Sequence, residues 1–252
     1  MEQDLKSTQI SKEAIDSLAS KRIFFGHMSV GYNILNGVEK IVGTDGKFST
    51  LKIIELSENN RISGPGIYHA KNGKNSYPDT KCEAFKNILL KNDFGKNLDI
   101  AFFKFCYVDI KDNSNVQSIF DNYAATIEEI KRELPELQII HVTIPLRTHV
   151  WGIKQKIKRI LKADIANINR YKFNQLLIAK YSESEAIYDL ARIESTLPDG
   201  SRSSFKHKGD VYYSLFDKYT YDGGHLNELG SFLAGQELLR ILADVSTKTT
   251  SE

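Results

Sequence analysis

The stretch Asp99-Ile100-Ala101-Phe102-Phe103-Lys104-Phe105-Cys106-Tyr107-Val108 is nearly continuous apolar sequence. A strand covered by helices on both faces has this composition, whereas a strand with one face in water alternates apolar and polar residues. The stretch therefore predicts a central strand of a parallel sheet. Lys104 is unusual within it. If Lys104 is buried it needs a carboxylate partner, with Asp109 or Asp222 as candidates, and otherwise it marks an edge or the far end of the strand.

Strand and helix patterns alternate on both sides of this stretch. Apolar runs predict further strands at residues 22–25, 48–56, 138–143 and 186–190. Helical spacing of apolar residues predicts helices near 32–41, 80–91, 116–134, 162–181 and 228–242. Such alternation favours parallel strands joined by right-handed helical crossovers. We therefore expect an α/β fold, a three-layer α/β/α sandwich with a mostly parallel five-stranded sheet, in which 57–79 is turn-rich and 198–209 is a long loop.

Length and composition agree with one globular unit. The chain has 252 residues, of which 41% are hydrophobic and 26% charged, as is ordinary for a globular protein with a sizeable core. We expect a single domain over 1–252 with its core at about 20–243. Residues 1–8 and 244–252 are expected to be flexible.

Charge and hydropathy argue against two classes of partner. The net charge is +2, which gives no reason to expect nucleic acid binding, and we interpret the basic cluster at 154–162 as a solvated helix face. No stretch reaches the roughly 20 apolar residues of a membrane span, so we expect no membrane insertion. Residues 1–6 lack the basic and apolar regions of a leader peptide. The compartment stays open: cytoplasmic as the sequence is written, exported if a leader has been removed. The oligomeric state is not predicted.

The cysteines and histidines do not indicate a metal site. Cys82 and Cys106 form neither a disulfide framework nor a metal-ligand pattern, so we expect buried thiols. The histidines at 69, 141, 149 and 207 are scattered, without the spacing typical of a zinc site. We therefore expect no metal and no cofactor.

An acid and a base lie three residues apart in the stretch Tyr221-Asp222-Gly223-Gly224-His225-Leu226-Asn227-Glu228-Leu229-Gly230. A histidine that takes a proton from a nucleophile needs its other ring nitrogen held by a carboxylate, and the spacing of Asp222 and His225 can supply this within one loop. The two glycines allow a tight turn between them. A helix cap at Asp222 or Asn227 is the structural alternative.

A candidate nucleophile follows the first predicted strand. In an open parallel sheet, ligands lie beyond the carboxyl ends of the strands, and Ser29 in Gly26-His27-Met28-Ser29-Val30-Gly31 falls between a strand and a helix. There its backbone N–H and the helix dipole would favour developing negative charge. The alternative role for Ser29 is an ordinary helix N-cap. A serine after the first strand and an Asp-x-x-His in the last loop form a joint arrangement that suggests one mechanism, with Ser29 as nucleophile and the Asp222–His225 pair as base.

With these residues in place, the chain resembles the SGNH, or GDSL-type, esterase/lipase superfamily from about residue 22 to 242. The family's last block, Asp-x-x-His, matches 222–225, and the trailing Leu226-Asn227-x-x-Gly230 is typical of it. The first block places its serine after Gly-Asp; here Gly26-His27-Met28-Ser29 keeps the glycine and serine but loses the aspartate and gains a residue. The third block, Gly-x-Asn-Asp, aligns with Cys106-Tyr107-Val108-Asp109, in which only the final aspartate matches. Asn167-x-x-Arg170-x-x-x-Asn174 and Tyr188-Asp189-Leu190-Ala191 also look like the family's late helix and fifth strand.

This resemblance implies a flavodoxin-like, SGNH hydrolase-like fold and acyl transfer to water. The implied catalytic residues are Ser29, His225 and Asp222. The implied oxyanion hole uses the N–H groups of Ser29 and Gly73, with Gly73 preferred over Gly64 and Gly66. The family's oxyanion asparagine falls on Val108, which has no side-chain donor. Either Asn75 or a backbone N–H replaces it, or the hole is incomplete.

Three further residues are candidate substrate contacts. They are His27, Asp109 and Tyr107. For His27 the alternative is a histidine that holds its own loop, and for Asp109 it is a loop cap.

The resemblance implies ester substrates in general. The polar loop 61–79, rich in Asn, Lys and Tyr, favours a small-molecule or glycan ester such as an O-acetylated carbohydrate. A lysophospholipid or an acyl thioester is the alternative substrate class. A catalytically weak or inactive SGNH-like protein that binds a glycan or a partner is the alternative function.

Overall fold

The computed structural model describes residues 10–57, 62–149 and 164–248. Its centre is a sheet of six parallel strands in the order β2-β3-β1-β4-β5-β6. These strands are β1 (Arg22–His27), β2 (Ile53–Glu55), β3 (Gly66–Lys71), β4 (Ile100–Phe103), β5 (Gln138–Val142) and β6 (Ala186–Tyr188). The predicted α/β fold with a parallel sheet is confirmed, with one strand more than the five expected.

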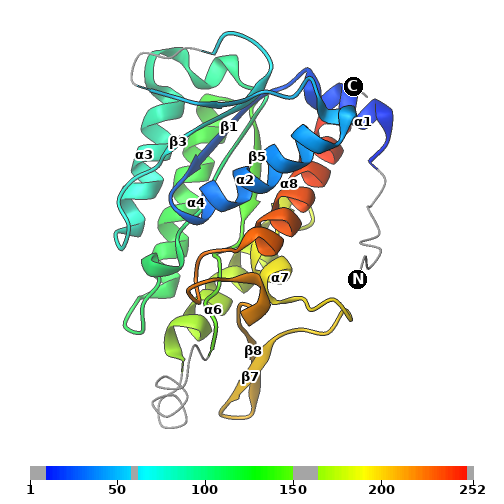
Figure 1. Ribbon diagram of the computed structural model, residues 1–252. Coiled ribbons are helices and arrows are strands. Elements are labelled where there is room, and N and C mark those ends of the chain that lie inside the picture. The colour runs from blue at the N-terminus through cyan, green and yellow to red at the C-terminus, as the bar shows by residue number, and fades with distance from the viewer. Residues whose placement is uncertain (1–9, 58–61, 150–163, 249–252) are drawn as a thin grey trace.

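Helices cover both faces of the sheet, which makes the three predicted layers (Figure 1). One layer holds α1 (Lys12–Ala19), α2 (Val30–Thr44), α7 (Leu190–Ser195) and α8 (Glu228–Lys248). The other holds α3 (Pro78–Leu90), α4 (Val116–Glu133) and α6 (Ile165–Tyr181). Short 3-10 turns lie at Gly46–Phe48, Lys91–Asp93, Gly95–Asn97, Tyr107–Asp109 and Asp217–Tyr219.

The two layers are built by the alternation of side chains along each strand. In β1, Ile23 and Phe25 belong to the core beneath α2 and α8, whereas Phe24 belongs to the core beneath α3 and α4. All three are fully buried. Successive side chains of a strand point to opposite faces, so a strand that is covered on both sides must be apolar throughout.

Close contact between α2 and α8 fixes the layer that carries the predicted nucleophile and base. A Cβ added to Gly37 would lie 1.9 Å from the carbonyl oxygen of Ser231, and one added to Gly235 would lie 2.6 Å from the Gly37 backbone. The two helices can cross this closely only because both positions are glycine.

The segment 57–79 contains a strand that its turn-rich sequence did not predict. β3 pairs with β1 and with β2, so it lies inside the sheet. Tyr68 and His69 interrupt its apolar pattern; the Tyr68 hydroxyl donates to the carbonyl of Gly64, and His69 meets a histidine of β1. The hydropathy pattern did not indicate this strand, because the polar atoms of Tyr68 and His69 find their hydrogen-bond partners only in the folded chain.

Two other expectations need correction, and a third concerns residues that the structure does not describe. The predicted loop 198–209 contains β7 (Ser204–His207), which pairs with β8 (Asp210–Tyr213) in an antiparallel hairpin. Residues 244–248 are not flexible but continue α8, with Ser246 fully buried. The basic cluster at 154–162 lies outside the described residues.

The buried charges and thiols lie near the carboxyl end of β4. Cys82 and Cys106 are free and buried, as expected. Lys104 directly follows β4 and is fully buried, so it marks the end of the strand. Its Nζ donates to the carbonyl of Phe105 (3.5 Å) and to Cys106 Sγ (3.6 Å); within the described residues it forms no ion pair, so neither Asp109 nor Asp222 is its partner.

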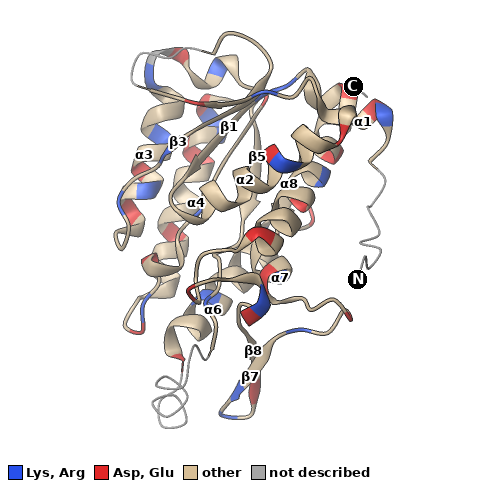
Figure 2. Cartoon of the chain, viewed as in Figure 1, with Lys and Arg blue, Asp and Glu red and all other residues tan. Residues whose placement is uncertain are grey.

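Charged side chains are mixed on the surface. Figure 2 shows basic and acidic residues interspersed along α3 and α4. None of the helices in the described part of the chain combines the length and the hydropathy that crossing a membrane requires.

Candidate active site

Asp222 and His225 are joined as the sequence predicted. The Nδ1 atom of His225 lies 2.6 Å from Asp222 Oδ2, and Asp222 Oδ1 accepts the backbone N–H groups of Gly224 (2.9 Å) and His225 (2.7 Å). Burial opposes ionisation of Asp222, but these hydrogen bonds outweigh it and hold the pKa of the carboxyl below its usual value. Asp222 therefore stays a carboxylate and leaves Nε2 of His225 as the nitrogen available for proton transfer.

The loop that carries the pair is closed by Thr220. Its hydroxyl accepts the N–H groups of Asp222 (3.3 Å) and Gly223 (3.0 Å) and donates to the carbonyl of His225. Gly223 has φ 84°, in the left-handed region that glycine adopts without strain. Local hydrogen bonds thus set the loop conformation, which is why its sequence was informative.

Two tyrosines flank the His225 ring. The Tyr107 ring meets it edge-on with centroids 5.8 Å apart, and the Tyr221 ring lies nearly parallel to it at 6.0 Å. A Cβ at Gly224 would fall within 2.9 Å of the Tyr107 hydroxyl, so the glycine makes room for this contact. The Arg147 guanidinium lies 5.3 Å from the Tyr107 centroid. Tyr107 thus lies next to the base, as a candidate substrate contact requires.

Ser29 immediately precedes α2, at the carboxyl end of β1. Its hydroxyl does not cap the helix, and within the described residues it forms no hydrogen bond to His225 or to another group. The N-cap alternative therefore does not account for its side chain. Asn33, one turn into α2, accepts the N–H of Leu226 through Oδ1 (3.2 Å). This bond ties the helix that begins after Ser29 to the residue that follows His225.

His27 is a structural residue, and its proposed contact with substrate is wrong. The side chain is fully buried, and Nε2 lies 3.1 Å from Nδ1 of His69. Burial, with the nearby Lys104 charge, lowers the pKa of His27 to about 3, so the ring is neutral. A Cβ at Gly31 would lie 2.3 Å from this ring, so glycine is needed where α2 passes over it.

Asp109 is likewise buried and holds two loops together rather than facing a ligand. Its Oδ2 accepts the N–H of Cys106 (2.6 Å) and its Oδ1 accepts the N–H of Ser76 (2.7 Å). Burial raises the pKa of Asp109, while the nearby Lys81 ammonium opposes the rise. The loop-cap alternative is the correct one, and Asp109 fastens the loop after β3 to the loop after β4.

Gly73 and Asn75 lie in that first loop. Gly73 has φ 63°, and a Cβ there would lie 2.7 Å from the Lys81 backbone. The exposed Asn75 accepts a hydrogen bond from Lys81 Nζ at its Oδ1 (3.2 Å). Lys81 is fully buried, and no pattern in the sequence distinguishes it from Lys86, the partly exposed lysine of the same helix.

The asparagine and arginine residues of α6 form hydrogen bonds to the loops that follow β4 and β5. Arg170 donates to the carbonyls of Tyr107 (2.9 Å) and Ile110 (3.3 Å). Asn174 accepts the N–H of Ile144 and donates to its carbonyl, which fixes the loop after β5. The pattern identified in the sequence therefore holds two loops at the carboxyl edge of the sheet.

A groove of about 380 Å³ borders the loop that carries Asp222 and His225. It lies between α2 and the start of α8. The residues that line it are Asn33, Asn36, Gly37, Lys40, Tyr221, Leu226, Asn227, Glu228 and Ser231. The lining combines side-chain amides and a hydroxyl with a larger area of apolar surface, and Tyr221 is 61% exposed.

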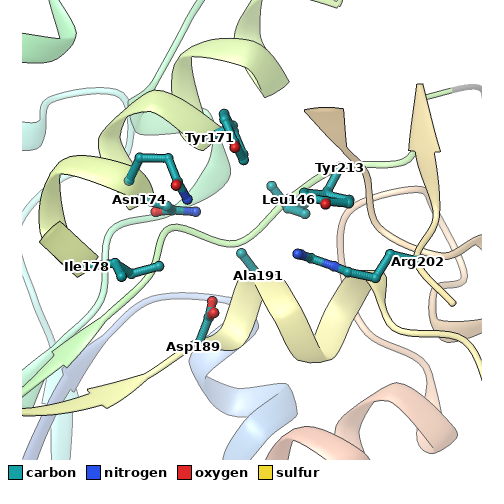
Figure 3. A pocket seen from close by; sticks show the side chains of 9 residues that line it. Leu146, Tyr171, Asn174, Ile178, Asp189, Ala191, Arg202 and Tyr213 are labelled. Carbon is teal, nitrogen blue, oxygen red and sulfur yellow. The ribbon is translucent and has the colours of Figure 1, made fainter. Parts of the chain in front are cut away.

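Two other hollows are lined by neither Asp222 nor His225. Figure 3 shows a small pocket beside the end of β6, where the Arg202 side chain reaches toward the centre. The volume of this pocket is about 30 Å³. The Arg202 guanidinium is held over the Tyr213 ring at 3.5 Å and donates to Ser195 Oγ. A larger hollow of about 650 Å³ lies between α7 and α8. Within the described residues, no group of three or more His, Cys, Asp or Glu side chains could hold a metal ion.

Comparison with known proteins finds similarity in structure only. No family model and no curated protein matches the sequence. A lipase/acylhydrolase from Enterococcus faecalis superposes with a TM-score of 0.53 at 15% identity, over 90% of this chain and 96% of that one. A GDSL-like lipase from Bacteroides thetaiotaomicron superposes with a TM-score of 0.52 at 14% identity, over 92% and 89%. The chain therefore has the fold of the GDSL-like, or SGNH, hydrolases.

Proposed function

We propose that the protein is a serine-dependent ester hydrolase that removes O-acetyl or other short acyl groups from a carbohydrate or a similar polar substrate. The observation that carries the proposal is the 2.6 Å contact between Asp222 and His225 in a loop tied to the start of α2. A pure binding protein has no need of a carboxylate-oriented histidine beside a serine whose hydroxyl is uncommitted. The fold likeness agrees with this chemistry.

In the proposed reaction, Ser29 Oγ attacks the ester carbonyl carbon while Nε2 of His225 takes the hydroxyl proton. Asp222 stabilises the imidazolium that forms. The tetrahedral intermediate collapses when the bond to the alcohol oxygen breaks, and His225 gives its proton to that oxygen. Water then attacks the acyl-Ser29 ester with His225 again as the base, which releases the acid and restores the serine.

The oxyanion would be held by the backbone N–H groups of Ser29 and Gly73 together with the Asn75 amide. Ser29 adjoins the N-terminus of α2, where unpaired N–H groups and the helix dipole favour negative charge. Gly73 directly follows Asn72, whose N–H donates to the carbonyl of His27 (3.0 Å). The candidate donors thus follow the adjacent strands β1 and β3, at the same edge of the sheet.

The side-chain amides that line the groove between α2 and α8 support a polar alcohol as the leaving group. Side-chain amides both donate and accept hydrogen bonds, as sugar hydroxyls do, and an exposed tyrosine ring offers an apolar face. Asn33 and Asn36 provide such amides beside Tyr221.

Hydrolysis of matched esters tests the proposal. We expect the wild-type protein to release acetate from p-nitrophenyl acetate and from an O-acetylated xylo-oligosaccharide, with much slower turnover of p-nitrophenyl decanoate and lysophosphatidylcholine. Ser29→Ala should abolish turnover of all four while leaving thermal unfolding unchanged. Lack of hydrolysis of every ester would favour the binding function, for which Val108 at the family's asparagine position is the supporting observation.

A further inference from the structure

Lys81, near the start of α3, has a charged group that is completely enclosed. The side chain has no exposed surface, and its Nζ lies 3.3 Å from the carbonyl oxygen of Asn72, 3.2 Å from Asn75 Oδ1 and 3.7 Å from Cys106 Sγ. Asp109 Oδ2 is also 3.7 Å away. An ammonium has three protons and no lone pair, so every group it faces must be an acceptor.

This requirement fixes the orientation of the Asn75 side-chain amide. The oxygen must face Lys81, because rotating the amide by half a turn would bring its NH₂ group against an ammonium that can only donate. The Nδ2 donors of Asn75 therefore point away from the buried lysine. Because Asn75 is an exposed residue, those donors are available to a ligand.

Asn75 also lies next to the place where the family's oxyanion asparagine is missing. The following residue, Ser76, donates its N–H to Asp109 and its hydroxyl to the carbonyl of Val108 (3.4 Å). Tyr107, on the other side of Val108, contacts the His225 ring. A continuous set of contacts thus leads from the base through the loop after β4 to Asn75.

We propose that Lys81 is a positioning residue that aims the Asn75 amide at the oxyanion, so that Asn75 supplies the hydrogen bond that Val108 does not. This role rests on the proposed ester hydrolysis. It assigns the third oxyanion donor to the loop after β3 instead of the loop after β4. It also gives a reason for a fully buried lysine in an otherwise ordinary helix.

Three variants at positions 75 and 108 test the donor. Asn75→Ala should lower kcat on p-nitrophenyl acetate by about 10²–10³-fold with little change in KM, as loss of one oxyanion donor does. Asn75→Asp should lose at least as much, although its carboxylate can still pair with Lys81 and preserve the fold. Adding Val108→Asn to Asn75→Ala should raise kcat at least tenfold above that of Asn75→Ala alone, because it returns a side-chain amide to the position that the family's asparagine occupies.

The role of Lys81 is tested by coupling. Lys81→Met should lower kcat, and Lys81→Met combined with Asn75→Ala should lose no more than Asn75→Ala alone, because the lysine acts through the asparagine. Lys86→Met is the matched control on the same helix, since Lys86 pairs with Glu129 of α4 and not with Asn75. Urea unfolding of each variant separates a folding defect from a loss of turnover.

The outcomes distinguish this role from the function on which it rests. If wild-type protein hydrolyses the ester and Asn75→Ala keeps kcat within about threefold, the donor assignment is wrong while the hydrolase function stands. If the losses of Lys81→Met and Asn75→Ala are fully additive, Lys81 does not act through Asn75. If Lys81→Met fails to fold, the position-75 and position-108 variants decide the donor alone. Wild-type protein that hydrolyses no ester overturns both proposals.

Discussion

Asp222 accepts three hydrogen bonds from one short loop: one from the His225 ring and two from the backbone N–H groups of Gly224 and His225. The carboxylate therefore orders the loop and orients the ring at the same time. Substitution by asparagine separates these tasks, because Oδ1 can still accept the backbone donors while the amide NH₂ opposes the required tautomer of His225.

We expect Asp222→Asn to lower kcat by about 10⁴-fold, as in other hydrolases where the base loses its orienting carboxylate. The loop should keep its conformation, so the thermal unfolding midpoint should change little. Steady-state kinetics on p-nitrophenyl acetate measures the first effect and scanning calorimetry the second. A variant that keeps more than a tenth of wild-type kcat would show that His225 does not depend on Asp222.

Asn33→Ala should reduce turnover through the placement of the base. The substitution removes the acceptor for the Leu226 N–H, which links the helix after Ser29 to the loop that carries His225. Small displacements of catalytic groups cost up to about 10²-fold in rate. We expect kcat to fall with Asn33→Ala and to recover in part with Asn33→Asp, which keeps the acceptor oxygen. Equal losses in both variants would contradict a positioning role.

Gly73→Ala should destabilise the fold. A Cβ at this position would lie 2.7 Å from the Lys81 backbone, and the φ of 63° is unfavourable for alanine. Strain of this kind costs about 1–3 kcal/mol. Gly43→Ala is the matched control: it lies in α2 with no heavy atom within 4 Å of the added Cβ, and should be neutral or stabilising. Urea unfolding compares the two, and equal stability would contradict the prediction.

Glu194 should destabilise the wild-type protein increasingly as pH rises from about 5 to 8. Burial, partly opposed by the Leu146 N–H hydrogen bond, raises the pKa of Glu194 to about 8 from an ordinary value of 4.5. Between these values Glu194 is protonated in the native state and ionised in the unfolded state, so its contribution makes unfolding easier by at most about 1.4 kcal/mol per pH unit. Glu194→Gln keeps an acceptor for Leu146 and removes the titrating group. Its stability should exceed that of wild type increasingly up to pH 8, and parallel curves would contradict this.

Hydropathy predicted the parts of the fold that are uniformly apolar. The run around β4 identified a central strand because both of its faces are covered. β3 was missed because Tyr68 and His69 are polar residues whose partners, Gly64 and His27, are brought to them only by folding. The β7–β8 hairpin was missed for a related reason, since its Ser, Lys and His residues read as loop.

The same distinction, between local pattern and contacts that form only on folding, applies to the residues of the site. Asp222 and His225 interact within one loop, so their spacing in the sequence predicted their contact. His27 and Asp109 were assigned to substrate because a sequence does not reveal burial, and the structure buries both side chains. Lys81 could not be identified at all, because its acceptors come from three separate positions of two loops.

The central claim is that His225 activates Ser29. It is tested most directly by treating folded protein with a fluorophosphonate probe and locating the adduct by peptide mass spectrometry, with His225→Ala alongside. The account predicts a single adduct on Ser29 that disappears in the His225→Ala variant. Wild-type protein that is folded but unlabelled at Ser29, or equal labelling of Ser29 with and without His225, would contradict it.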